Sequence, residues 1–128
     1  MNWKGIVVHH SDSRDVSANE IDRWHKERGW NGIGYHFVIR QDGSIEPGRE
    51  LDKQGAHDKV RNKTHIGVCL AGKIHQQPPT IDQLASLQKL LRGLMERFDI
   101  EVKSIDRHHG KCPGQYFPME LMKNNLVG

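Results

Sequence analysis

Apolar residues recur every three or four positions over residues 84–98, and this period predicts an amphipathic helix with one buried face. Thr80, with Gln83 three residues later, forms a capping box that places the start of the helix just before this pattern. A second capping box, Ser17 with Glu20, precedes a shorter apolar face. It predicts another helix, which ends at the next Arg-Gly pair.

Short apolar runs elsewhere predict strands. Residues 5–10 and 66–70 are continuous runs of mainly apolar residues, which is typical of fully buried strands. In residues 35–40, apolar and polar positions alternate. An Asp-Gly turn after the alternating run leads into residues 45–46 and indicates a hairpin. Residues 101–105 form a weaker alternating pattern, interpreted as a last strand. This order predicts an α/β (α+β) domain with a single mixed central β-sheet flanked by helices.

The remaining segments add little regular structure. The polar residues 50–63 have no strong period and predict a loop over the candidate site, and residues 118–123 predict a short closing helix. Gly67 lies inside an apolar strand pattern, which indicates that another group packs closely there. Neither a repeat nor a linker interrupts the pattern, so we expect residues 1–128 to form one domain.

Charge and hydropathy narrow the function. The formal net charge is +3, and the lysines and arginines are scattered, which excludes a basic arm of the nucleic-acid-binding kind. No apolar run approaches the about 20 residues needed to cross a bilayer, and no apolar segment follows Met1 as in a signal peptide. We therefore expect synthesis in the cytoplasm, with neither nucleic acid nor a membrane as partner. A mildly basic surface equally suits an anionic polymer such as the bacterial cell wall.

Candidate metal-ligating and catalytic side chains are most concentrated in residues 107–114, which contain two adjacent histidines, a lysine and a cysteine. Imidazole nitrogen and thiolate sulfur are the ligands that Zn²⁺ prefers. Adjacent residues of an extended chain point in opposite directions, so this segment offers Cys112 and one histidine, either His108 or His109. Three protein ligands with a fourth position left to water is the arrangement of a catalytic zinc site.

The third ligand is expected at the end of the first strand, since α/β folds place their chemistry at the carboxyl ends of strands. His9 lies inside the apolar run and His10 at its exit, and we favour His9. The other cysteine, Cys69, lies in a buried strand pattern. A reducing compartment argues against a disulfide between Cys69 and Cys112.

Taken together, these motifs resemble the zinc-dependent N-acetylmuramoyl-L-alanine amidases of the type 2 class, in particular the single-domain members from T-odd coliphages. That class shares its fold with the peptidoglycan recognition proteins. The resemblance runs over nearly the whole chain. The segments that carry it are Val-Val-His-His-Ser at 7–11, Trp-His-Lys-Glu-Arg-Gly-Trp at 24–30, Gly-Tyr-His-Phe-Val-Ile at 34–39, Asp-Gly-Ser-Ile-Glu-Pro-Gly-Arg at 42–49, Ile-Gly-Val-Cys-Leu at 66–70 and His-His-Gly-Lys-Cys-Pro at 108–113.

The resemblance implies one zinc ion per chain, held by His9, His108 and Cys112, and catalytic roles for Tyr35 and Lys111. In the family the segment between the second histidine and the cysteine is longer than the three residues found here. Lys111 therefore stands one place before the cysteine, where the family's lysine stands two places before it. A residue at this place need not point in the same direction.

The resemblance further implies hydrolysis of the amide bond between N-acetylmuramic acid and L-alanine of the stem peptide. The expected enzyme is a monomeric phage or prophage endolysin that acts on peptidoglycan in the periplasm after release. His57 is expected to contact substrate from the loop over the site. The alternatives are a non-catalytic peptidoglycan-binding module of the same fold and a cytoplasmic wall-recycling amidase. A complete ligand set disfavours the first, and the cysteine at 112, where recycling members typically carry aspartate, disfavours the second.

Overall fold

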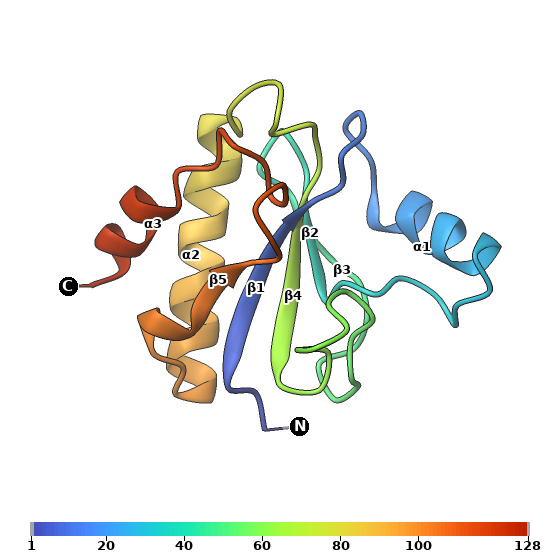
Figure 1. Ribbon diagram of the computed structural model, residues 1–128, viewed down its shortest axis with the longest axis horizontal. Coiled ribbons are helices and arrows are strands. Elements are labelled where there is room, and N and C mark those ends of the chain that lie inside the picture. Colours follow the sequence, from blue (N-terminus) through green and yellow to red (C-terminus); the bar gives the residue numbers. More distant parts are fainter. Residues whose placement is uncertain (1, 128) are drawn as a thin grey trace.

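A five-stranded mixed sheet organises the protein, in a computed structural model that describes residues 2–127 (Figure 1). The strand order is β3-β2-β4-β1-β5. β2, β4, β1 and β5 run parallel to one another, and the edge strand β3 is antiparallel to β2 as the second arm of the expected hairpin. The strands are β1 (Gly5–His10), β2 (Phe37–Ile39), β3 (Ile45–Pro47), β4 (His65–Leu70) and β5 (Ile105–Arg107).

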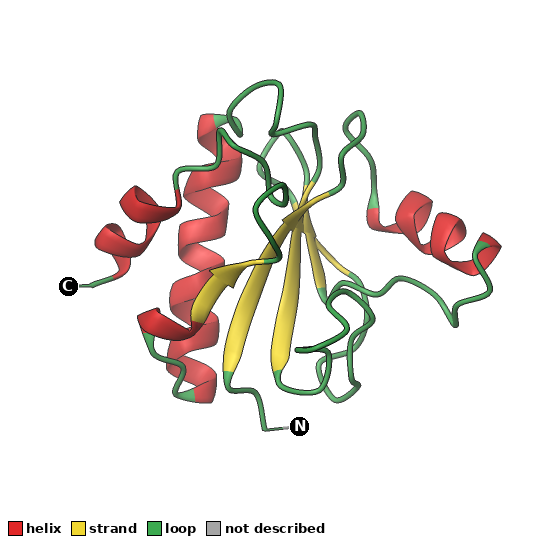
Figure 2. Ribbon diagram, viewed as in Figure 1, coloured by secondary structure: helices red, strands yellow, loops and turns green. Residues whose placement is uncertain are grey.

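Helices cover both faces of the sheet (Figure 2). α2 (Ile81–Phe98) and α3 (Met119–Leu126) lie on one side, and α1 (Ala18–Glu27) lies on the other. Both predicted capping boxes are present, at Ser17 and at Thr80. The fold class predicted from the pattern is confirmed, since each helix presents one apolar face to the sheet.

Alternation along the strands separates two apolar clusters. The larger cluster joins Val8, Val68 and Leu70 to α2 and α3, whereas the smaller one joins Val38 and Cys69 to α1. Successive side chains of a strand point to opposite faces, so the direction of each residue at the end of β1 is fixed. His9 pairs with Cys69 and faces the α1 side, while His10 pairs with Leu70 and faces the α2 side.

The prediction of a strand over residues 101–105 is wrong. Val102–Ser104 form a single turn of 3₁₀-helix, and β5 begins only at Ile105. Val102 packs against the core and Ile105 is buried. Because these residues are three apart, both side chains can face the core on a helical turn, whereas on a strand they would point to opposite faces. The two cysteines are free thiols, and no helix in the described part of the chain is long and apolar enough to cross a bilayer.

Candidate metal centre and groove

Parallel pairing brings the two groups of candidate ligands together. β5 lies beside β1, so the loop that follows Arg107 passes over the end of β1. One ligand atom from each of His9, His108 and Cys112 lies within 4.8 Å of the other two. Nδ1 of His9 lies 3.7 Å from Sγ of Cys112, and the ring centroids of His9 and His108 lie 4.7 Å apart. These are the three residues that the resemblance implies as ligands.

Cys112 is held by backbone hydrogen bonds. His109 and Cys112 exchange two of them, at 3.2 and 3.1 Å, which closes the short loop, and the amide of His10 donates to Sγ at 3.4 Å. Burial raises the pKa of the Cys112 thiol to about 11. In the metal-free protein the sulfur is therefore a neutral thiol, and a bound metal must displace its proton.

A second cluster of residues with possible metal-ligating atoms consists of His10, Asp12 and His75. Nδ1 of His10 accepts a hydrogen bond from the amide of Ile74 at 3.1 Å. The proton of its neutral ring is therefore on Nε2, and neither nitrogen has a free lone pair. Without a lone pair from His10, this cluster offers only Asp12 and His75 to a metal ion.

Arg61 orients the segment that carries His108. Its guanidinium group donates to the carbonyl oxygens of Arg107 and His108, at 3.0 and 3.1 Å, and pairs with the buried carboxylate of Asp58 at 2.7 Å. Sequence reasoning missed this residue. Nothing in the sequence separates Arg61 from the lysines around it, since its role depends on contacts made about 46 residues further along the chain.

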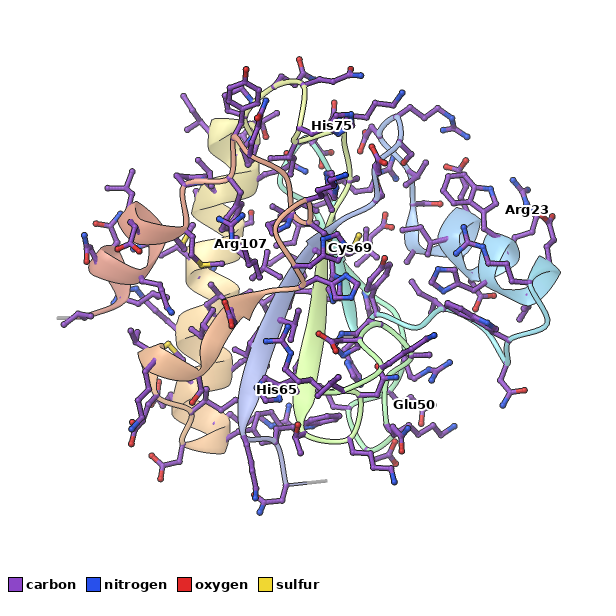
Figure 3. All side chains as sticks on the ribbon, viewed as in Figure 1. Arg23, Glu50, His65, Cys69, His75 and Arg107 are labelled. Carbon is purple, nitrogen blue, oxygen red and sulfur yellow. The ribbon has the colours of Figure 1, made fainter. Side chains whose placement is uncertain are left out.

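Tyr35 lies against the ligand cluster, with its ring 5.1 Å from that of His9. Burial, and to a lesser extent the thiols of Cys69 and Cys112, raise the pKa of Tyr35 well above its usual value. The phenol therefore keeps its proton at neutral pH. Figure 3 shows Cys69 toward one end of β4 and His65 at the other, and Cys69 is paired with His9 on β1.

A groove of about 760 Å³ opens beside the cluster and is lined by His108. Both aromatic and basic groups line it, so the groove offers a flat apolar surface and positive charge to a ligand. The lining residues are His25, Arg28, Trp30, Tyr35, Ala56, His57, Asp58, Lys59, Val60, Arg61, Asn62, His108 and His109.

Lys111 is not among the residues that line this groove. It lines a separate hollow with Asp12 and His75, while His109, two residues earlier, lines the groove. The shortened loop accounts for this placement, because Lys111 immediately precedes the buried Cys112 and points away from it. A catalytic role for Lys111 stays a prediction.

His57 lies deeper than a rim residue. The side chain is buried, and its Nδ1 lies 2.9 Å from Nε2 of His9. Burial lowers the pKa of His57 to about 4, so the ring is neutral at pH 7. His57 also lines the groove, and contact with a substrate stays a prediction.

Comparison with known proteins identifies the family. Residues 1–115 match the model of the N-acetylmuramoyl-L-alanine amidase family. The chain belongs to this family. It is 40% identical to the endolysin of Escherichia phage T7 over 134 residues, covering 95% of this chain and 87% of that protein. It is 39% identical to the endolysin of Klebsiella phage KP32 over 132 residues, covering 95% of this chain and 87% of that one.

Solved structures agree with this assignment. The amidase chain superposes on N-acetylmuramoyl-L-alanine amidase LysC from Clostridium intestinale with a TM-score of 0.93 and 38% identity, covering 98% of this chain and 86% of that one. Bumblebee peptidoglycan recognition protein SA superposes with a TM-score of 0.85 at 21% identity, covering 97% of this chain and 82% of that one. At that identity the second likeness concerns the fold alone.

Proposed function

We propose that this chain is a zinc-dependent peptidoglycan amidase of the endolysin type. It hydrolyses the amide bond between N-acetylmuramic acid and L-alanine of the stem peptide. The observation that carries the proposal is the convergence of His9, His108 and Cys112 beside a basic groove that His108 lines, in a chain of the amidase family. The phage relatives, which are endolysins, support action on the cell wall after release.

The donor set supports zinc as the metal, at one ion per chain. Two imidazoles and one thiolate form a mixed nitrogen and sulfur set that zinc accepts, and three protein ligands are typical of catalytic zinc sites. Burial lowers the pKa of His9 well below its usual value, so this ring is neutral and able to ligate at pH 7. A bound zinc ion supplies an activated water and polarises a carbonyl group.

The protein's own groups bind and orient the substrate. Tyr35 lines the groove beside His9, and we infer that its protonated hydroxyl donates a hydrogen bond to the substrate carbonyl or passes a proton to the leaving amine. Trp30 is 41% exposed and Arg28 lies 5.8 Å above its ring, so together they offer a stacking surface next to a positive charge. Lys59 adds further positive charge, which suits the carboxylates of stem peptides.

Digestion of purified peptidoglycan tests the proposal. We expect new free amino groups of L-alanine without new reducing sugar ends, and loss of this release when zinc is removed with a chelator and when Cys112 is replaced by serine. Reducing ends without free amines would indicate a glycosidase and overturn the proposal. Binding of peptidoglycan without release of either group would overturn it in favour of a binding module. Gel filtration and metal analysis test the expected monomer and the expected one zinc per chain.

A further inference from the structure

We propose that His57 is a positioning residue that fixes the tautomer and the orientation of His9, so that Nδ1 of His9 faces the metal. The proposal rests on the metal site of the proposed function and deepens it. It assigns to His57 a role through His9, in place of direct contact with the reacting groups.

A chain of three hydrogen-bonding groups carries the argument. Nε2 of His57 lies 3.0 Å from the carbonyl oxygen of His65, and a carbonyl can only accept, so the proton of the neutral His57 ring is on Nε2. Nδ1 of His57 is then an acceptor. Because it lies 2.9 Å from Nε2 of His9, the proton of His9 must be on Nε2. The lone pair of His9 is therefore on Nδ1, the atom that lies 3.7 Å from Sγ of Cys112.

The backbone leaves room for the His57 ring at two glycines. A Cβ added at Gly67, in the middle of β4, would lie 2.6 Å from Cγ and Cδ2 of His57. A Cβ added at Gly55 would lie 2.5 Å from Cδ2 of the same ring. The amide of His57 also donates to the side-chain oxygen of Asn62 at 2.7 Å. The ring is thus confined between two backbone segments with both nitrogens paired, an arrangement that suits a support for another residue and leaves no nitrogen for a metal.

The structural role of the pair follows from burial. His9 is 1% exposed, so its Nε2–H cannot turn to water, and His57 supplies the acceptor it needs. Partners of this kind fix the tautomer and ring orientation of a metal-ligating histidine, and their loss weakens metal binding about 10–100-fold.

Two variants of similar size separate the hydrogen bond from the packing. His57→Asn keeps an acceptor close to the position of Nδ1, whereas His57→Leu fills the same space without one. Competition with a zinc chelator should show about 10–100-fold weaker zinc binding in His57→Leu and recovery of most of that loss in His57→Asn. Equal zinc affinity in wild type and His57→Leu would overturn the proposal. An asparagine variant as weak as the leucine variant would also overturn it.

A measurement on the metal-free wild-type protein needs no variant. Nitrogen-15 NMR of the imidazole groups should show His9 protonated on Nε2 and His57 protonated on Nε2. Protonation of His9 on Nδ1 would overturn the inference, whatever the variants do. Because this readout depends on neither zinc nor hydrolysis, it can fail while amidase activity is confirmed, and it can succeed while the proposed activity fails.

Discussion

A single methyl group added at Gly67 tests how closely the fold and the metal centre depend on each other. In Gly67→Ala the new Cβ would lie 2.6 Å from the His57 ring, far inside normal contact distance. The ring cannot move aside and keep its bonds, which are 2.9 Å to His9 and 3.0 Å to the carbonyl of His65. We therefore expect the substitution to displace His57 and leave the buried Nε2–H of His9 without its acceptor.

The size of the effect follows from three opposing terms. Replacing a glycine in a strand by alanine stabilises by about 0.5–1 kcal/mol where there is room. Overpacking a close-packed interior costs about 1–3 kcal/mol, and a buried donor without its partner costs a similar amount. The central values give a net destabilisation of about 3 kcal/mol, or a drop in Tm of roughly 10 °C. Zinc affinity should fall about tenfold or more, as it does when an outer partner is lost.

Thermal unfolding of the metal-free protein and chelator competition measure the two effects. Gly93→Ala is the matched control, because Gly93 lies on α2 with nothing within 4 Å of its added Cβ. The control should be stabilised by up to about 1 kcal/mol and keep its zinc affinity. If Gly67→Ala unfolds at or above the wild-type temperature and binds zinc equally well, the close approach of His57 to β4 is not what holds the ring, and the reasoning is refuted.

Four further predictions concern the ligands and their supports. Cys112→Ser should lose zinc affinity by more than about 100-fold, whereas Cys69→Ser should keep both metal and activity, as metal analysis and digestion of peptidoglycan would show. His108→Ala should lose zinc and His109→Ala should retain it, and the reverse result would move the second ligand by one residue. Arg61→Leu should destabilise the fold by roughly 2 kcal/mol in chemical denaturation, because it leaves a buried aspartate unpaired, and should weaken zinc binding through the loosened backbone at His108. Binding of zinc at pH 7 should release about one proton, because the Cys112 thiol, with its pKa raised to about 11, must lose its proton while His9 is already neutral. For the same reason, zinc affinity should rise about tenfold per pH unit up to the pKa of the free thiol. Calorimetry in two buffers of different ionisation enthalpy measures the proton release.

The parts of the fold that could be predicted from sequence depend on local chemistry. The capping boxes at Ser17 and Thr80 are contacts between residues three apart, so the sequence predicts them without knowledge of the rest of the fold, and the structure contains both. Alternation within the first strand separated His9 from His10 in the same way, since side chains of adjacent strand residues point to opposite faces. The strand expected over residues 101–105 was wrong, because a spacing of three residues and an alternation are hard to tell apart in so short a segment.

What could not be predicted depends on contacts between distant segments. Gly67 indicated that something packs against the middle of its strand, but only the structure identifies that group as His57, from a loop expected to lie over the site. Arg61 belongs to the same loop and reaches the carbonyls after β5. The direction of Lys111 depends on the geometry of a shortened loop, for which the sequence offers no periodic pattern.

The hydrogen bonds of the buried histidines explain which of them suits a metal. His10, His25 and His36 each accept a backbone amide proton at Nδ1, so that lone pair is used and the remaining nitrogen carries the proton. The donating amides belong to Ile74, Gly34 and Gly67, respectively. His57 uses its acceptor nitrogen on His9. His9 alone among these five has its acceptor nitrogen directed at a thiol, so its lone pair would be available to a metal ion bound with Cys112, whereas the other four histidines use theirs on protein donors.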